Sequence, residues 1–402
     1  MVNKEVHSAS RDNGQKQGGR LAPFALGFRP FFLVAGWFGI ILMIIFLLAY
    51  YTHIWHYNYY DFSIWHGHEM LFGYTVAVIA GFLLTAVRNW TGVDTPVQGA
   101  LAGLLLLWLV PRLFQVIPVL PPVVTALADM LFLPVLAFVL AGPIWKARQV
   151  RNYSVPVILV LIAAANGMVH LEILGLADDS AATGLRFGIN LVIVLIALIA
   201  GRVIPFFVER GLPGVVIRRQ QMLEKISMYS LYGFVLTELF FPQTLIATAV
   251  ALFAAVVHGF RMRSWYHNRI WSQPMLWVLL LAYGWLVFGL TLHALSNSGL
   301  LASLPAIHAL TVGAIGMFTL GMMARVSLGH TGRSIRSLPR MFAAVLLLFA
   351  AALFRVVSPI LMASENEWFM AVSGFSWVAA MFIFAAVYSP ILIRERADGK
   401  PG

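Results

Sequence analysis

The chain has 402 residues, of which 60% are hydrophobic and only 11% are charged. This balance excludes an ordinary water-soluble globular protein and indicates a polytopic membrane protein. The net charge is +11, but the basic residues lie in short segments between apolar runs and form no continuous patch, so nucleic acid is not an expected partner.

The chain opens with a polar and basic stretch. Residues 1–22 include Lys4, Arg11, Lys16 and Arg20 and contain no apolar core. We therefore expect a disordered cytoplasmic tail here and not a cleaved signal peptide. A single transmembrane domain is expected over residues 23–395, and residues 396–402 are expected to form a second cytoplasmic tail.

Apolar segments long enough to cross the hydrocarbon core follow one another through the transmembrane domain. Since a crossing helix needs about 20 apolar residues, the sequence predicts an all-α polytopic bundle with about twelve transmembrane helices. The predicted spans are residues 31–51, 69–87, 97–117, 123–141, 156–176, 185–207, 226–241, 244–260, 274–295, 307–324, 341–362 and 369–393.

The positions of lysine and arginine predict the orientation of these spans, because cytoplasmic loops carry the excess of both residues. If the amino terminus is cytoplasmic, only Arg112, Arg186 and Arg355 of the 27 basic residues lie on the outer side. Both termini are therefore expected in the cytoplasm, with membrane lipids around the bundle.

The chain has no cysteine, which excludes disulfides, iron–sulfur clusters, thiolate-ligated haem and covalently attached haem. Any metal must therefore be bound by histidine, methionine or a carboxylate. Five of the eleven histidines fall at the predicted outer ends of the second, fifth, ninth and tenth spans: His66, His68, His170, His293 and His308. Because an idle polar group in hydrocarbon is costly, this layer predicts a metal or haem site. Packed histidines that only donate and accept hydrogen bonds are the alternative.

Two of these histidines belong to the segment Trp-His-Gly-His-Glu-Met at residues 65–70. On a regular helix, His66 and His68 point about 200° apart and cannot bind one ion on one face. Either the helix begins irregularly or the two residues serve separate sites. The neighbouring carboxylate of Glu69 can orient an imidazole ligand.

An internal similarity relates the second span to the tenth. His68, Gly73, Gly81 and Thr91-Gly92 recur at the same offsets as His308, Gly313, Gly321 and Thr331-Gly332. This is consistent with an old duplication that presents two histidines at equal depth, above glycines that admit a flat ligand. We therefore predict that His68 and His308 contact haem iron, and that His66, His170 and His293 are ligands of copper or of a second site.

Four arginines lie at the predicted inner ends of spans: Arg29, Arg88, Arg202 and Arg325. A guanidinium group pairs well with the carboxylates of a porphyrin or with an anionic substrate, so these residues are predicted cofactor contacts. The alternative is that they anchor the helices near lipid phosphates.

The chain resembles the NnrS family in segments spread over nearly its whole length. They are Gly27-Phe28-Arg29-Pro30-Phe31-Phe32, Trp65-His66-Gly67-His68-Glu69-Met70, Asn89-Trp90-Thr91-Gly92, Gly201-Arg202-Val203-Ile204-Pro205-Phe206-Phe207, His308-Ala309-Leu310-Thr311 and Gly329-His330-Thr331-Gly332-Arg333. The resemblance implies a twelve-span protein of the bacterial inner membrane that contains haem, non-covalent and b-type, and copper. It also implies a role in resistance to nitric oxide and nitrosative stress, often alongside denitrification.

Two functions remain open at this point. In the first, the protein carries out redox or metal-nitrosyl chemistry on nitric oxide or nitrosyl metal species at a periplasmic-side site. In the second, it is a twelve-helix transporter that uses its histidines and arginines to bind an anion or a metal complex.

Overall fold

A computed structural model describes residues 21–55, 59–115, 117, 119–335, 339–362 and 366–400. Most of the predicted amino-terminal tail, residues 1–20, lies outside the described residues, as do the last two residues of the predicted carboxy-terminal tail. The described residues form helices and loops and no β-strand. This is the expected result for a chain in hydrocarbon, where a helix satisfies its own backbone hydrogen bonds.

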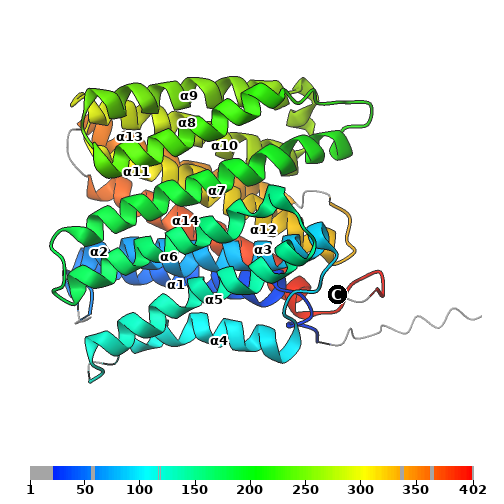
Figure 1. The fold of residues 1–402 in the computed structure, drawn as a ribbon, viewed down its shortest axis with the longest axis horizontal. Coiled ribbons are helices and arrows are strands. Elements are labelled where there is room, and N and C mark those ends of the chain that lie inside the picture. Colours follow the sequence, from blue (N-terminus) through cyan, green and yellow to red (C-terminus); the bar gives the residue numbers. More distant parts are fainter. Residues whose placement is uncertain are drawn as a thin grey trace, which may run out of the picture.

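The helices follow one another through the whole described chain (Figure 1). In order they are α1 (Phe28–Thr52), α2 (Phe62–His68), η1 (Glu69–Thr75), α3 (Val76–Thr91), α4 (Gln98–Phe114), α5 (Pro122–Lys146), η2 (Val150–Asn152), α6 (Ser154–Ile173), α7 (Ser180–Gly211), α8 (Gln221–Phe240), α9 (Leu245–Trp265), η3 (Asn268–Ser272), α10 (Pro274–Asn297), α11 (Ser303–His308), η4 (Ala309–Gly316), α12 (Met317–His330), α13 (Pro339–Met362) and α14 (Glu367–Ile393).

The all-α polytopic fold is confirmed, and each of the predicted spans coincides with a helix. Within the described chain, 10 helices are long and apolar enough to cross a membrane, counting α2–η1–α3 and α11–η4–α12 as one helix each. Two predicted spans are not among them. The helix α4 has only 17 residues, and α8 carries Glu224, Lys225 and Glu238 in its 20 residues.

The helices run side by side along the long axis of the molecule, with α4 at one edge and α9 at the other (Figure 1). Among the packed pairs are α1 with α14, α6 with α7, and α10 with α9. The helix α7 packs on both α6 and α10 and so joins the two halves of the bundle.

The two ends of the described chain meet at one end of the bundle. The backbone N–H of Ala22 donates to the carbonyl oxygen of Ile393 at 2.8 Å, and Nη1 of the buried Arg29 donates to the carbonyl oxygen of Leu392 at 3.0 Å. We call this the inner end, following the orientation that the basic residues predict, and the opposite end the outer end.

The internal similarity of the sequence corresponds to a repeated local structure. A π-helix begins one residue after His68, as η1, and another begins one residue after His308, as η4. Each continues into an α-helix that ends near a glycine of positive φ, Gly92 at 67° and Gly332 at 70°. The repeat extends to packing, since α3 lies on α1 and α5 while α12 lies on α10 and α14. Because π-helices are rare and occur frequently at functional sites, the outer halves of these two helices are candidate functional regions.

The glycines of the repeat allow close packing, and this can be tested at Gly313. A Cβ atom at this position would lie 2.5 Å from Cδ2 of Trp285. We expect Gly313→Ala to destabilise the protein by about 1–3 kcal/mol, the usual cost of overpacking, measured as a lower thermal unfolding midpoint in detergent. The control is Gly103→Ala in α4, where a Cβ atom would meet nothing within 4 Å. Equal midpoints for the two variants would contradict this packing.

Candidate metal centre and outer cavity

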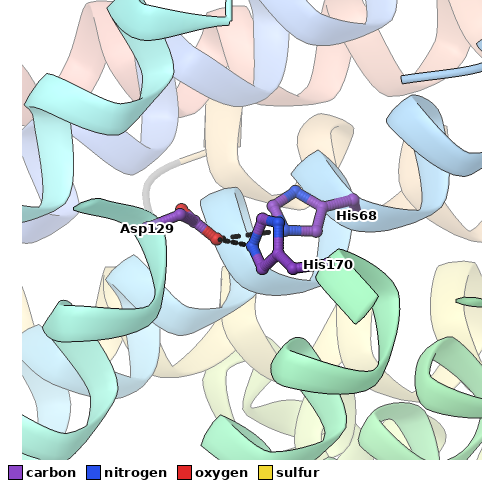
Figure 2. Close-up of side chains that lie close together, drawn as sticks. All are labelled: His68, Asp129 and His170. Atoms are coloured by element: carbon purple, nitrogen blue, oxygen red, sulfur yellow. Dashed lines mark hydrogen bonds and ion pairs between the residues drawn. The ribbon is translucent and has the colours of Figure 1, made fainter. Parts of the chain in front are cut away.

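A cluster of buried polar side chains lies at the outer end of the first half of the bundle. His68 ends α2, Asp129 lies in α5 and His170 lies in α6, and all three are buried. His68 Nε2 and His170 Nε2 lie 3.1 and 3.0 Å from the same oxygen, Oδ2 of Asp129. Figure 2 shows both imidazole rings beside that carboxylate. The three ligand atoms lie within 4.8 Å of one another, so the three side chains can hold a metal ion together. We call these residues the histidine–aspartate centre.

The second nitrogen of each imidazole is also held. His68 Nδ1 lies 2.8 Å from Glu69 Oε1, and His170 Nδ1 lies 2.8 Å from the hydroxyl of Tyr59. Metal-binding histidines usually have such a partner, because it fixes the tautomer and the orientation of the ring. The centre therefore has both the donors and the supporting hydrogen bonds of a metal site.

Arg112 of α4 is the cationic partner of the two carboxylates in this region. Its Nη1 donates to Glu69 Oε2 at 3.2 Å, and its Nη2 pairs with Asp129 Oδ1. Glu69 also accepts a hydrogen bond of 2.7 Å from Gln115 Nε2. With neutral imidazoles, two buried carboxylates and one buried guanidinium leave one negative charge in excess. Because an uncompensated buried charge is costly, this charge must be neutralised, either by a bound cation or by a proton on His68, whose two ring nitrogens both face carboxylate oxygens.

The loop before α2 covers the centre with two tyrosines. The hydroxyl of Tyr60 lies 3.1 Å from His68 Nε2. Burial raises the pKa of Tyr60 well above its usual range, and the Glu69 carboxylate adds to this shift. Burial likewise raises the pKa of Tyr59. Both phenols are therefore neutral at physiological pH in the structure.

A cavity of about 470 Å³ lies on the other side of α2. Residues of α1, α2, η1, α7, α11, η4, α13 and α14 line it, and most of its wall is apolar. His66 and His308 both reach it. His308 Nδ1 donates to the carbonyl oxygen of Leu304 at 3.0 Å, which leaves Nε2 as the nitrogen that can bind a metal. The Nδ1 atom of His66 is buried and makes no hydrogen bond to any described residue.

Only three basic residues are predicted on the outer side of the membrane, and all three lie at the histidine–aspartate centre or the cavity. Arg186 of α7 and Arg355 of α13 line the cavity, and Arg112 contacts the histidine–aspartate centre. Basic residues on the outer side are thus placed where anionic groups occur or can bind.

The structure groups the five predicted histidines differently from the sequence. It brings His66 together with His308 at the cavity, and His68 together with His170 at the buried centre. His68 does not line the cavity, so the predicted pairing of His68 with His308 is not the pairing that the geometry gives. The reason is the spacing of two residues on α2, which directs His66 and His68 to opposite faces. His293 lies apart from both, with Nδ1 3.7 Å from Glu238 Oε2.

The four inner arginines contact other parts of the protein, and none lines the cavity. Arg29 donates to carbonyl oxygens at the end of α14, and Arg88 pairs with Asp94 at 2.8 Å. Arg202 donates to Asn152 Oδ1 at 2.5 Å and lies over the ring of Trp90. Arg325 lies over Phe207, with Cζ 3.8 Å from the ring centroid.

Sequence reasoning did not assign Asp129 to the metal site or the outer arginines to the cavity. A signal for each was present, because Asp129 is a carboxylate inside an apolar span and the arginines break the charge rule. Neither signal tells which helices are neighbours. Which of these side chains lie together could therefore be seen only in the three-dimensional fold.

A family model described as NnrS protein matches residues 22–396, nearly the whole chain. The chain belongs to the NnrS family. Membership confirms the resemblance seen in the sequence and makes the chain a multi-pass membrane protein of a family linked to the nitric oxide response. A search of curated proteins found no match.

The charge balance at the centre of this NnrS-family protein predicts a large effect of Arg112→Gln. The variant leaves Glu69 and Asp129 buried without their cation, so we expect a loss of about 3–5 kcal/mol in stability, measured by thermal unfolding in detergent. The control is Arg88→Gln, because Arg88 and Asp94 form an exposed pair (38% and 82% exposed side chains). An exposed pair contributes only about 0–1 kcal/mol. Similar midpoints for the two variants would refute the role of Arg112.

Proposed function

We propose that this NnrS-family protein binds haem and copper in the bacterial inner membrane and acts in resistance to nitric oxide and nitrosative stress. Its activity is redox or metal-nitrosyl chemistry on nitric oxide or nitrosyl metal species, at the outer, periplasmic end of the bundle. One observation carries the proposal: in a chain of this family, two histidine sites of different character lie on opposite faces of α2.

The outer cavity fits a haem. Its volume of about 470 Å³ is within the usual range of cofactor sites, roughly 300–1,000 Å³, and its wall is mainly apolar. His308, with Nε2 left available, and His66, whose Nδ1 is unbonded, are the residues that would hold the iron. Arg186 and Arg355 would pair with the two carboxylates of the porphyrin. The absence of cysteine makes the haem non-covalent.

The histidine–aspartate centre fits copper. Two imidazole nitrogens and one carboxylate oxygen are a donor set that first-row divalent metals accept, and copper binds most tightly in that series. Glu69 and Tyr59 would keep the two imidazoles in the orientation that binding needs. The negative charge in excess around Arg112 would be neutralised by the ion.

The residues around the two sites provide surroundings suited to one-electron chemistry of bound metals on a small molecule. Bound haem and copper would supply redox change, and a metal ion held by the three donors of the histidine–aspartate centre would keep an open coordination position. The apolar wall of the cavity keeps water away, and the buried polar groups of the centre hold charge in place. His66 and His68 project from opposite faces of α2, so this helix stands between the two sites.

Transport of an anion or a metal complex is a second candidate function, because the cavity presents two arginines in an apolar environment. In that case Arg186 and Arg355 would bind the cargo, and no haem would be needed.

Cofactor content tests these assignments. We expect the purified protein to show a Soret band and bound copper. The variants His66→Ala and His308→Ala should lose haem and keep copper, since both residues line the cavity. The variants Asp129→Asn and His170→Ala should lose copper and keep haem. The control His293→Ala, outside both sites, should keep both cofactors. Absorption spectra and metal analysis are the measurements.

Two results would contradict the proposal. If His66→Ala and His308→Ala both kept full haem content and an unchanged spectrum, the cavity would not be the haem site. A colourless, metal-free preparation that transports an anion in vesicles would favour the second candidate function.

A further inference from the structure

A second, smaller pocket lies among the middle turns of three long helices. Its volume is about 40 Å³, and its wall includes Val78 and Ile79 of α3, Val192 and Leu195 of α7, and Phe318 and Met322 of α12. These residues lie near the centres of the continuous helices Phe62–Thr91, Ser180–Gly211 and Ser303–His330, so the pocket is about halfway between the inner and outer ends of the bundle. We call it the midway pocket.

The midway pocket is apolar, because its two hydroxyl groups are bonded within the protein. Thr75 donates to the carbonyl oxygen of Met70 at 2.8 Å. Thr319 bonds the carbonyl oxygens of Ile315 and Gly316 at 2.8 and 2.9 Å. The remaining wall is aliphatic, aromatic or thioether. The pocket therefore offers water no hydrogen-bond partner, and apolar spaces of this chemistry are those that xenon occupies in larger engineered cavities.

The size of the pocket limits what can enter it. A space of about 10–15 Å³ on this measure holds one water-sized molecule, so about 40 Å³ holds a few atoms only. An anion or a metal complex would lose its hydration there without any compensating group. Small uncharged gases are the chemical class that fits both the volume and the wall.

The midway pocket adjoins the outer cavity. Thr75 lines both spaces. In addition, Tyr74 of the cavity wall and Thr319 of the pocket wall are joined by a hydrogen bond of 3.0 Å between their hydroxyls. A gas molecule in the pocket is therefore next to the deep end of the cavity, on the side away from the outer surface.

We propose that the midway pocket is a docking site for a small apolar gas, which in this protein is nitric oxide on its way from the membrane interior to the outer cavity. The choice of nitric oxide rests on the proposed function, whereas the gas site itself rests on the pocket. Nitric oxide is uncharged and dissolves in hydrocarbon, so it can occupy an apolar pocket at mid-depth that charged species cannot enter.

Xenon is the probe for the site. Crystals of the full-length protein are pressurised with xenon, and we expect xenon density in the midway pocket. Val192→Phe should fill the pocket and remove this density, while Ile79→Ala should enlarge the pocket and increase xenon occupancy. The matched control is Val194→Phe, the same change at a buried position of α7 that lines neither space. If Val192→Phe does not fold, Ile79→Ala still tests the site.

A kinetic measurement tests the route to the cavity. The rate of nitric oxide binding to the reduced protein, followed by stopped-flow absorption, should fall several-fold in Val192→Phe and stay near the wild-type rate in Val194→Phe. Wild-type crystals without xenon density would overturn the gas site, and equal rates in the two variants would overturn the route. A haem-free protein with xenon in the pocket would overturn the proposed function and support the gas site.

Discussion

The contact of Arg112 with Glu69 and Asp129 is the interaction on which the buried polar cluster around His68 and His170 depends. It brings three charges from η1, α4 and α5 into an interior that would otherwise be apolar. The carboxylates in turn hold the imidazoles. Glu69 contacts Nδ1 of His68, and Asp129 contacts Nε2 of both His68 and His170. Because a buried charge is tolerated only when it is paired and hydrogen-bonded, these contacts are coupled, and the loss of one weakens the others.

The helix α2 separates two environments that differ in polarity. On one face, His68 is enclosed by carboxylates, an amide and phenols, whereas on the other His66 lies against Phe46 and an apolar cavity. The polar face suits a small cation, and the apolar face suits a large flat cofactor. A single turn of helix thus presents two histidines to two environments of different polarity, without a flexible loop between them.

Much of the fold could be predicted from the sequence, because the length of each apolar segment reflects the thickness of the membrane that the helices cross. The outer histidine layer and the opposite directions of His66 and His68 could be predicted for the same kind of local reason. The grouping of the histidines could not, since it depends on which helices pack together. Asp129 becomes a partner of His170 only because α5 packs on α6. His68 and His308 are equivalent in the sequence repeat, but they border different sites in the structure, and Glu69 of the first copy is Ala309 in the second.

The two π-helices determine the direction in which the histidines before them point, relative to the α-helices that follow. A π-helix accommodates one more residue per turn than the α-helix around it, and each residue of an α-helix advances the side chains by about 100°. The segment η1 therefore rotates the outer turn that bears His66 and His68 relative to the inner helix α3. A lineage that lost one residue within Glu69–Thr75 would keep its glycine-packed inner helix and turn both imidazoles away from their present neighbours. The length of this segment, independent of its side chains, is thus a constraint that the backbone imposes on the evolution of the protein.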